Sequence, residues 1–384
     1  MKISVIVSVS VGLLAATALS GCAADEAESG ASEAEHHAVA WTLASIPASV
    51  GSVTVVKDAA GRPILGPNGK ATVYATARQA TPGDPSIYRS TDSGRTFVPV
   101  TGATFPTPGF VVAAPSNPNI LYAGQGPACM AGFPPELRRS ADGGRTWVEV
   151  AGGVADLDVN PTNPDHLVGV TCSGVVKSTD GGRSWREIHS DGLGDGSGFT
   201  RGVNDRTTLY ATFHSEGGSW WIHRSTDDGR TWQMPPVHGQ SLRSLEVDPL
   251  DAKHIYTVSW EGFASSANGG DTLNSHNDGL ETAKGEHGFA LSNVVLDHVS
   301  RPPPGATATL YIGSAGQWRD HAGAGVFRWD GVDHWTKFAA APGGEGVGQL
   351  AVVEVPGDPV LLAVTVNDYE TPGVGGHVYL REIR

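Results

Sequence analysis

The sequence predicts an all-β protein, a β-propeller built from seven four-stranded blades, and three observations lead to this prediction. A nine-residue pattern recurs four times, with intervals of 50, 38 and 47 residues between its aspartates. A period of this length indicates one supersecondary unit per repeat, packed against its neighbours. Upstream of most copies lies a second pair of short apolar runs joined by a turn, which gives four strands per repeat. The 384 residues include 51 glycines and 25 prolines, as expected for short strands joined by many turns.

Residues 1–21 are predicted to form an export signal. Lys2 supplies the positive charge, and residues 3–19 form an apolar run too short for an ordinary membrane span. The run ends in Leu-Ser-Gly-Cys22, which resembles the lipobox of bacterial lipoproteins. The resemblance implies that Cys22 is lipidated and attaches the protein to a membrane. Ala23 follows the cysteine, and by the same resemblance this favours the outer membrane over the inner membrane.

Residues 22–38 are predicted to form a flexible acidic tether that starts at the lipidated cysteine. The segment consists mainly of Ala, Glu, Asp, Ser and Gly and has almost no apolar surface to bury. Residues 39–384 then form a single propeller domain, because one closed ring uses this whole length.

Each copy of the repeat contains Asp-x-Gly between two short β-branched or aromatic runs, a pattern typical of a tight turn between antiparallel strands. Glycine adopts positive φ without a steric penalty, and Asp and Ser side chains bind nearby backbone amides. The aromatic residue after the turn is large enough to pack between adjacent sheets. These structural roles are assigned to Ser90, Asp92, Gly94, Ser140, Asp142, Gly144, Trp147, Ser178, Asp180, Gly182, Trp185, Ser225, Asp227, Gly229 and Trp232.

The consensus Ser-x-Asp-x-Gly-x-Thr-Trp resembles the Asp-box (BNR) repeat. That repeat occurs in β-propellers of sialidases, xyloglucanases, sortilin-type receptors and photosystem II assembly factors. Four copies match almost completely: 89–97, 139–147, 177–185 and 224–232. Two weaker copies follow at 266–273 and 327–335. The resemblance implies the fold and does not select one of these families.

Six blades are expected at about 51–100, 108–150, 154–188, 199–233, 242–274 and 289–338. The remaining stretch, 348–383, supplies only three strands, and residues 39–43 are predicted to complete it as a fourth. This closure removes the exposed sheet edge that an open array would leave. The alternative is six blades with irregular ends.

Two cysteines remain after processing, Cys129 and Cys172. An even number of cysteines in an exported protein favours a disulfide. Both follow the second strand of neighbouring blades, so both are expected on the same face. Two unpaired buried thiols are the alternative.

Composition narrows the range of partners. The net charge of −14 argues against nucleic acid as a partner. The link between the fifth and sixth blades carries His276, Asp278, Glu281 and His287, but without the spacing of a known metal motif. We therefore expect no metal, no cofactor and a monomer.

A ligand site is expected on the face opposite the repeat turns. Because antiparallel strands alternate in direction, loops between second and third strands share this face with the links between blades. The longest irregular loops lie there, and loops on a rigid scaffold are where function concentrates. The predicted binding residues are His214, Glu216, Trp220, Trp318, Arg319, Asp320, His321, Asp368 and Tyr369, and the catalytic candidates are Asp320, Tyr369 and Glu370.

Aromatic rings that stack on a ligand, with polar groups that orient it, suit a protein or glycan partner. Binding without catalysis is therefore the favoured function. A sialidase-like hydrolase is the alternative, although the Arg-Ile-Pro signature of that family is absent and the nearest text is Ser45-Ile-Pro47. Another glycoside hydrolase or a lyase is also open, with two carboxylates at the channel mouth. Xyloglucanases resemble two propellers in tandem, whereas this chain has room for one.

Overall fold

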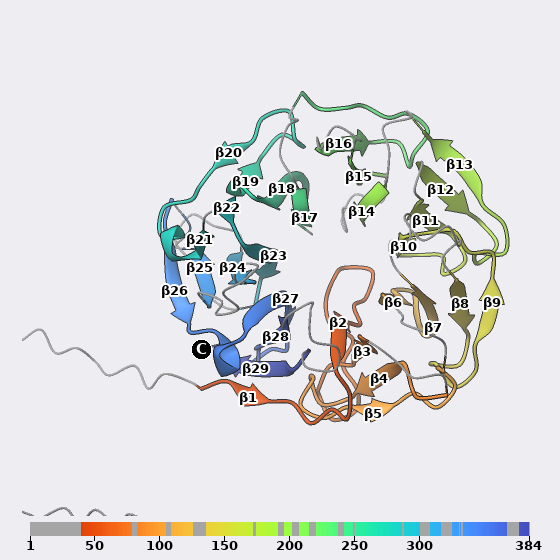
Figure 1. Ribbon diagram of the computed structural model, residues 1–384. Coiled ribbons are helices and arrows are strands. Elements are labelled where there is room, and N and C mark those ends of the chain that lie inside the picture. The colour runs from red at the N-terminus through yellow and green to blue at the C-terminus, as the bar shows by residue number, and fades with distance from the viewer. Residues whose placement is uncertain are drawn as a thin grey trace, which may run out of the picture. The chain divides into compact units, whose positions relative to one another are not determined.

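The computed structural model is an all-β propeller with almost no helix, and its sheets are arranged in a ring within the unit Val39–Arg384 (Figure 1). The structure describes residues 40–78, 83–104, 109–125, 136–171, 174–190, 196–201, 207–214, 220–236, 242–248, 250–285, 288–299, 308–315, 325–329, 331, 333–366 and 376–383.

Six sheets of the described chain are complete four-stranded antiparallel blades. Five of them follow the chain in order from the innermost to the outermost strand. Their strands are β2 (Val50–Val55), β3 (Val73–Ala77), β4 (Ile87–Ser90) and β5 (Val98–Pro99); β6 (Phe110–Ala114), β7 (Asn117–Gly124), β8 (Leu137–Ser140) and β9 (Val148–Val150); β10 (Asp156–Val159), β11 (Leu167–Val170), β12 (Val175–Ser178) and β13 (Arg186–His189); β17 (Leu242–Asp248), β18 (Asp251–Ser259), β19 (Gly262–Ser266) and β20 (Asn274–Ser275); and β23 (Leu291–Asp297), β24 (Thr309–Ser314), β25 (Val326–Trp329) and β26 (Trp335–Ala339).

The sixth complete blade joins the two ends of the propeller unit. Its order is β27 (Gly346–Val353), β28 (Val360–Val366), β29 (Val378–Glu382) and β1 (Thr42–Leu43). Thr42 pairs with Leu380 and Leu43 with Tyr379. The predicted closure by the N-terminal segment is therefore present, although two residues pair rather than the five expected.

One further sheet, with β14 (Gly196–Arg201), β15 (Leu209–His214) and β16 (Trp220–Ser225), has three strands. It stands in the ring between β10–β13 and β17–β20. The outer position is reduced to one bridge between Arg224 and Gln233. Pro235 and Pro236 follow closely, and prolines have no N–H to extend a ladder. Six complete blades is the number given by the alternative interpretation, so the prediction of seven four-stranded blades was one complete blade too many.

The core consists of apolar clusters in the seams between neighbouring sheets. In one seam, Val50 and Val73 pack with Leu362 and Leu380 across the junction of the first and last blades. The aromatic residue after each repeat turn enters the seam with the preceding sheet. Phe97 is buried there, while Trp147, Trp185 and Trp232 pack against their clusters with partial exposure. Each sheet is thus buried only through its neighbours.

The link between β20 and β23, expected to be a long polar loop, is partly ordered. It contains a short 3-10 helix, η1 (Glu281–Ala283), and a small hairpin of β21 (Lys284–Gly285) and β22 (Gly288–Phe289). Leu280 and Phe289 are buried in the seam beside Trp335. These three apolar side chains explain why the segment packs onto the ring. The other short helix is η2 (Pro342–Gly344).

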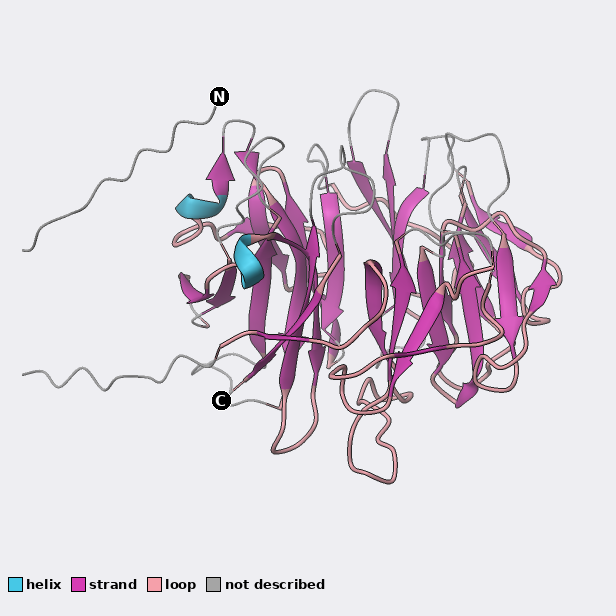
Figure 2. Cartoon of the chain, turned by 60° about the horizontal axis from the view of Figure 1, so that its bottom comes forward, coloured by secondary structure: helices cyan, strands magenta, loops and turns pink. Residues whose placement is uncertain are grey.

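The strands run between two faces of the ring (Figure 2). First and third strands run in the same direction, so loops between first and second strands share one face with the repeat turns. We call this the repeat-turn face. None of the helices in the described part is long and apolar enough to cross a membrane.

Candidate functional site

The aspartates of the repeat turns bind their own turns. In the turn at Asp142, Ser140 Oγ donates to the carboxylate at 2.9 Å and accepts from Gly144 N at 2.8 Å. The backbone N–H and hydroxyl of Thr146 donate to the two carboxylate oxygens at 2.9 and 2.7 Å. These Thr146 bonds lower the pKa of Asp142 to about 2, which keeps the carboxylate ionised. The turns at Asp92, Asp180 and Asp227 make equivalent bonds.

The weak copy at 266–273 has the same turn geometry. Ser266 Oγ contacts Asn268 Oδ1 at 2.8 Å, and Gly270 N donates to Ser266 Oγ at 2.9 Å. Asn268 accepts from Thr272 N at 3.0 Å. An amide oxygen thus replaces the carboxylate. In the last copy, Asp330 lies outside the described residues.

Only two of the predicted binding residues lie in the described part. His214 and Trp220 pair across the end of the β15–β16 hairpin, and only their backbone is described. Strands β15, β24 and β28 are second strands, so their carboxyl ends reach the face opposite the repeat turns. The other predicted site residues follow these strands and lie outside the described residues: Glu216, Trp318, Arg319, Asp320, His321, Asp368, Tyr369 and Glu370. Cys22, Cys129 and Cys172 also lie outside the described residues.

A cavity of about 270 Å³ opens along the inner strands β2, β17, β23 and β27. Its ionisable lining residues are Lys57, Glu246, His298 and Glu354. Each lies within the last three residues of an inner strand or one or two residues beyond its end. This places all four toward the repeat-turn face. The loop between β2 and β3, drawn in orange, extends over the middle of the ring (Figure 1), and its Gly61 also lines the cavity.

Glu354 links three blades at this end of the channel. It accepts a hydrogen bond of 2.7 Å from the backbone N of His298 on the preceding blade, and Lys57 Nζ of the next blade lies 4.0 Å from it. Asp248 and Asp297, at the same place in two other blades, bind the N–H of Leu250 and Val299 in their own turns. Because glutamate is one methylene longer than aspartate, Glu354 reaches the backbone of His298 on the preceding blade instead of its own turn. Its side chain is 7% exposed, so this carboxylate is committed to the wall.

Among the described residues that line the cavity, Glu246 is the other carboxyl group. Its side chain is half-buried and lines the cavity. Desolvation raises its pKa to about 7, a shift that the charge of Lys57 opposes. His298 is nearby in the lining, and both of its ring nitrogens are buried without a hydrogen-bond partner among the described residues. A carboxylic acid that is half-protonated near neutrality can donate or accept a proton.

Side-chain amides close the channel wall between the blades that carry these groups. Asn293 Nδ2 donates to Leu350 O at 2.9 Å, and Leu350 N donates to Asn293 Oδ1 at 2.7 Å. Gln349 makes the corresponding pair of bonds with Val53, at 2.9 and 3.3 Å. Each amide therefore replaces the strand-to-strand bonds that separate sheets cannot make, which fixes the positions of the inner strands.

In the described part of the β20–β23 link, His276 and Asp278 bind side chains of the turn between β25 and β26. His276 contacts Asp333 at 2.9 Å and Ser265 at 3.2 Å, and His334 contacts Asp278 at 2.7 Å. Within the described ranges no group of three metal-binding side chains comes together. The sequence missed the channel cluster because its members come from blades far apart in the chain. The sequence contains one indication of this cluster, which is that an ionisable residue lies near the end of each of the four inner strands β2, β17, β23 and β27.

The fold is shared with solved structures, of which three are compared below. The chain resembles the Niastella koreensis GH74 enzyme with a TM-score of 0.55 and 19% identity, over 85% of this chain and 54% of the enzyme. It therefore spans about half of that enzyme. It resembles YCF48 bound to D1 peptide with a TM-score of 0.54 and 13% identity, over 89% of this chain and 100% of YCF48. YCF48 from Cyanidioschyzon merolae gives 0.54 and 12%, over 89% and 99% of the two chains. These likenesses establish a β-propeller.

No protein-family model matches the chain, and no curated protein matches it.

Proposed function

We propose that this protein is a binding propeller that holds a partner protein or glycan without catalysing a reaction. The commitment of Glu354 to the channel wall carries the proposal. Hydrolysis of a glycosidic bond ordinarily needs two carboxyl groups, one on each side of the scissile bond. Glu354 bonds to the backbone of His298 and faces Lys57, so Glu246 has no second free carboxylate among the described residues that line the cavity.

The extent of the similar structures supports the same conclusion. YCF48, whose structure was solved with a D1 peptide, is matched over its whole length, whereas the GH74 enzyme is matched over about half. A single ring is thus enough for a propeller that binds a peptide. A segment of a partner protein is accordingly the first ligand to test, and a glycan is the second.

The binding face that we propose is the one opposite the repeat turns. The pairing of His214 with Trp220 and the direction of β15, β24 and β28 support this placement. The repeat turns themselves are poor candidates, because their carboxylates bind Ser and Thr of the same turn.

A matched pair of changes tests the binding face. The double variant Trp318→Ala and Asp320→Ala is expected to lose its partner with little change in melting temperature, because substitutions in the loops predicted from the sequence contribute little to stability. Asp142→Ala is expected to do the reverse. Pull-down from the envelope fraction and a glycan array identify the ligand for this comparison. Full binding by the double variant would overturn the proposed face.

We also propose that the protein is an exported lipoprotein of the outer membrane, with signal peptide 1–21, lipidated Cys22 and tether 22–38. Acyl chains contribute about 0.8 kcal/mol per buried methylene, and more than one chain gives stable anchoring. Cys22→Ser should release the protein from the membrane fraction. Retention of that variant after a high-salt wash contradicts lipid anchoring.

Glu246 supports a hydrolase as the second candidate function, since a carboxyl with a pKa of about 7 suits a general acid. A hydrolase with its site in this cavity loses activity in Glu246→Gln. A sialidase with its site on the opposite face loses activity in Tyr369→Phe instead. Sialoside and xyloglucan cleavage assays of both variants separate the two, and cleavage by the unchanged protein would refute the binding-only proposal.

A further inference from the structure

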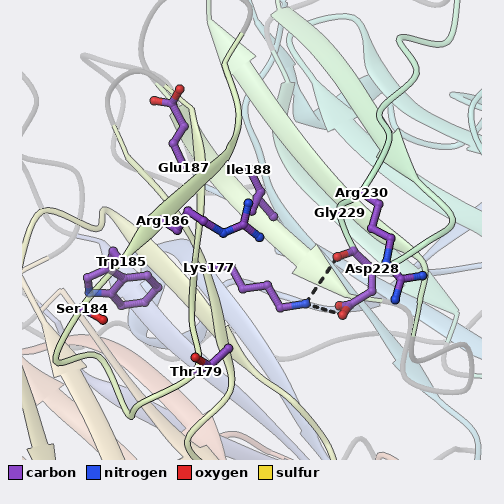
Figure 3. Close-up of a pocket in the computed structure, with 10 residues that line it drawn as sticks. All are labelled: Lys177, Thr179, Ser184, Trp185, Arg186, Glu187, Ile188, Asp228, Gly229 and Arg230. Atoms are coloured by element: carbon purple, nitrogen blue, oxygen red, sulfur yellow. Dashed lines mark hydrogen bonds and ion pairs between the residues drawn. The ribbon is translucent and has the colours of Figure 1, made fainter.

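A second hollow, with a volume of about 680 Å³, lies outside the channel, between the blade β10–β13 and the repeat turn of the sheet β14–β16 (Figure 3). We call it the seam groove. One wall is formed by Trp185, Arg186 and Ile188 of the β10–β13 blade, and the other by Asp228, Gly229 and Arg230. Its residues are separate from the predicted binding face and from the channel cluster, so a ligand held in the seam groove is independent of the proposed function.

Gly229 and Ile188, from opposite walls of the seam groove, are in direct contact. A Cβ added to Gly229 would lie 2.5 Å from Ile188 Cδ1, so the turn rests directly on Ile188. Beside it, Lys177 Nζ forms an ion pair with Asp228 (Figure 3). Asp228 has a φ of 60°, whereas glycines occupy this position in three other turns, at Gly143, Gly181 and Gly269. The ion pair with Asp228 neutralises the charge of Lys177.

Two cations in the seam groove remain without an acid. Arg186 and Arg230 are exposed, and neither guanidinium makes a hydrogen bond or ion pair with another described residue. Glu187 alternates to the other side of β13 and points away from them (Figure 3). In a protein with a net charge of −14, this places two unpaired guanidinium groups around one hollow.

Trp185 supplies an aromatic wall held in one orientation. Its Nε1 donates to Ala151 O, in the link from the preceding blade, at 2.8 Å. Trp147 and Trp232 differ, because each donates to the glycine carbonyl of its own turn, at 2.9 and 3.2 Å. Figure 3 shows Trp185 and Arg230 on opposite sides of the hollow, with Arg186 and Lys177 between them.

We propose that the seam groove binds an acidic oligosaccharide, in which a sugar ring packs on Trp185 and carboxylates of the sugar chain pair with Arg186 and with Arg230. A planar guanidinium matches a planar carboxylate with two parallel hydrogen bonds. The volume falls in the range of small-ligand sites, roughly 300–1,000 Å³. The hydroxyl of Thr179 and the lysine–aspartate pair offer further polar contacts for sugar hydroxyls.

The test is calorimetric titration of the full mature protein with trigalacturonic acid at low ionic strength. Arg186→Gln and Arg230→Gln should each weaken binding about tenfold, the equivalent of one lost charged hydrogen-bond pair. Trp185→Phe should also weaken binding, because it reduces the stacking surface. Arg145→Gln is the matched control, since Arg145 is the exposed arginine at the same position of another repeat turn.

Binding of trigalacturonic acid that is lost in the arginine variants and kept in Arg145→Gln supports the proposal. Equal binding of a neutral trisaccharide of the same length overturns it, as does unchanged affinity in both arginine variants. An acidic hexaglutamate peptide that binds more tightly than the saccharide, with the same dependence on the arginines, identifies a peptide site instead. The melting temperature of each variant confirms that the ring is intact, and absence of any binding refutes the site.

Discussion

Asn293 binds the backbone of Leu350 as a neighbouring strand would, through one donated and one accepted hydrogen bond. The inner strands of a propeller belong to separate sheets and cannot form a ladder with one another. Here side-chain amides make that connection, and Gln349 repeats it with Val53 in the next seam. The channel wall thereby acquires a fixed geometry at the position where Glu354 and Glu246 approach the cavity.

Asn293→Ala should lower the free energy of unfolding by about 2 kcal/mol, because it leaves a donor and an acceptor of Leu350 unpaired in a partly buried seam. Asn68→Ala is the control, since Asn68 also makes two side-chain bonds but is exposed to water. Urea denaturation of both variants measures the difference. Equal losses would show that the seam amide contributes no more than a surface amide.

Replacement of Asp142, Asp180 and Asp227 by asparagine should make the protein less stable at neutral pH and flatten its acid unfolding curve. Each of these aspartates has a pKa lowered to about 2. The stabilisation is therefore present above the ordinary aspartate pKa and is lost as pH falls through about 2. Denaturation midpoints between pH 7 and pH 2 measure the effect. A parallel curve for the triple variant would mean that the turns do not depend on charge.

Glu246→Gln should change the pH dependence in the opposite direction. The folded pKa of Glu246 is raised to about 7, so the folded protein binds its proton more tightly than the unfolded chain. Stability associated with this group is present at low pH and falls as pH rises from about 4.5 to about 7. The glutamine variant should be more stable than the parent at pH 8 and similar at pH 4. Thermal unfolding of both proteins at pH 8 and pH 4 measures this difference. An equal gain in stability at both pH values would exclude titration of Glu246 as the cause.

Deletion of residues 38–46 should lower the melting temperature by on the order of 10 °C, since it removes β1 and exposes the edge of β29. It also removes Trp41, whose Nε1 donates to Ala340 O at 2.9 Å. Deletion of residues 24–36 is the control and should leave the melting temperature unchanged. Similar melting of both shortened chains and the intact protein would contradict closure by the N-terminal segment.

The Cys129–Cys172 disulfide remains a prediction that mass spectrometry can test. Peptide mapping of the protein without reduction should recover the two cysteines as one linked peptide. A pair of free thiols would favour the alternative of two buried cysteines.

Much of the fold could be predicted because the repeat marks the third and fourth strands of each unit. The blade ranges expected from the copies at Asp92, Asp142 and Asp180 agree with the structure to within a few residues. The closing strand could be predicted because the last stretch had one strand too few. The incomplete sheet could not be predicted from its repeat, since the turn at Asp227 is regular and the ladder stops only near Pro235.

Less of the candidate site than of the fold could be predicted from the sequence. Loop composition placed the predicted site on the face opposite the repeat turns, and most of those residues lie outside the described part. The channel cluster is formed by Lys57, Glu246, His298 and Glu354 from four blades, and no local pattern states that they meet. The seam groove similarly depends on the contact between Gly229 and Ile188 of different sheets and on the orientation of Trp185.

The pairing of Thr42 with Leu380 also constrains when the ring can form. The first strand of the propeller has its partner almost at the end of the chain. A growing polypeptide can therefore build its blades one after another, but it cannot close the ring until β29 has been made. Until then β1 and the edge of β29 have no pairing partner, and the N-terminal segment stays unpaired while the blades fold.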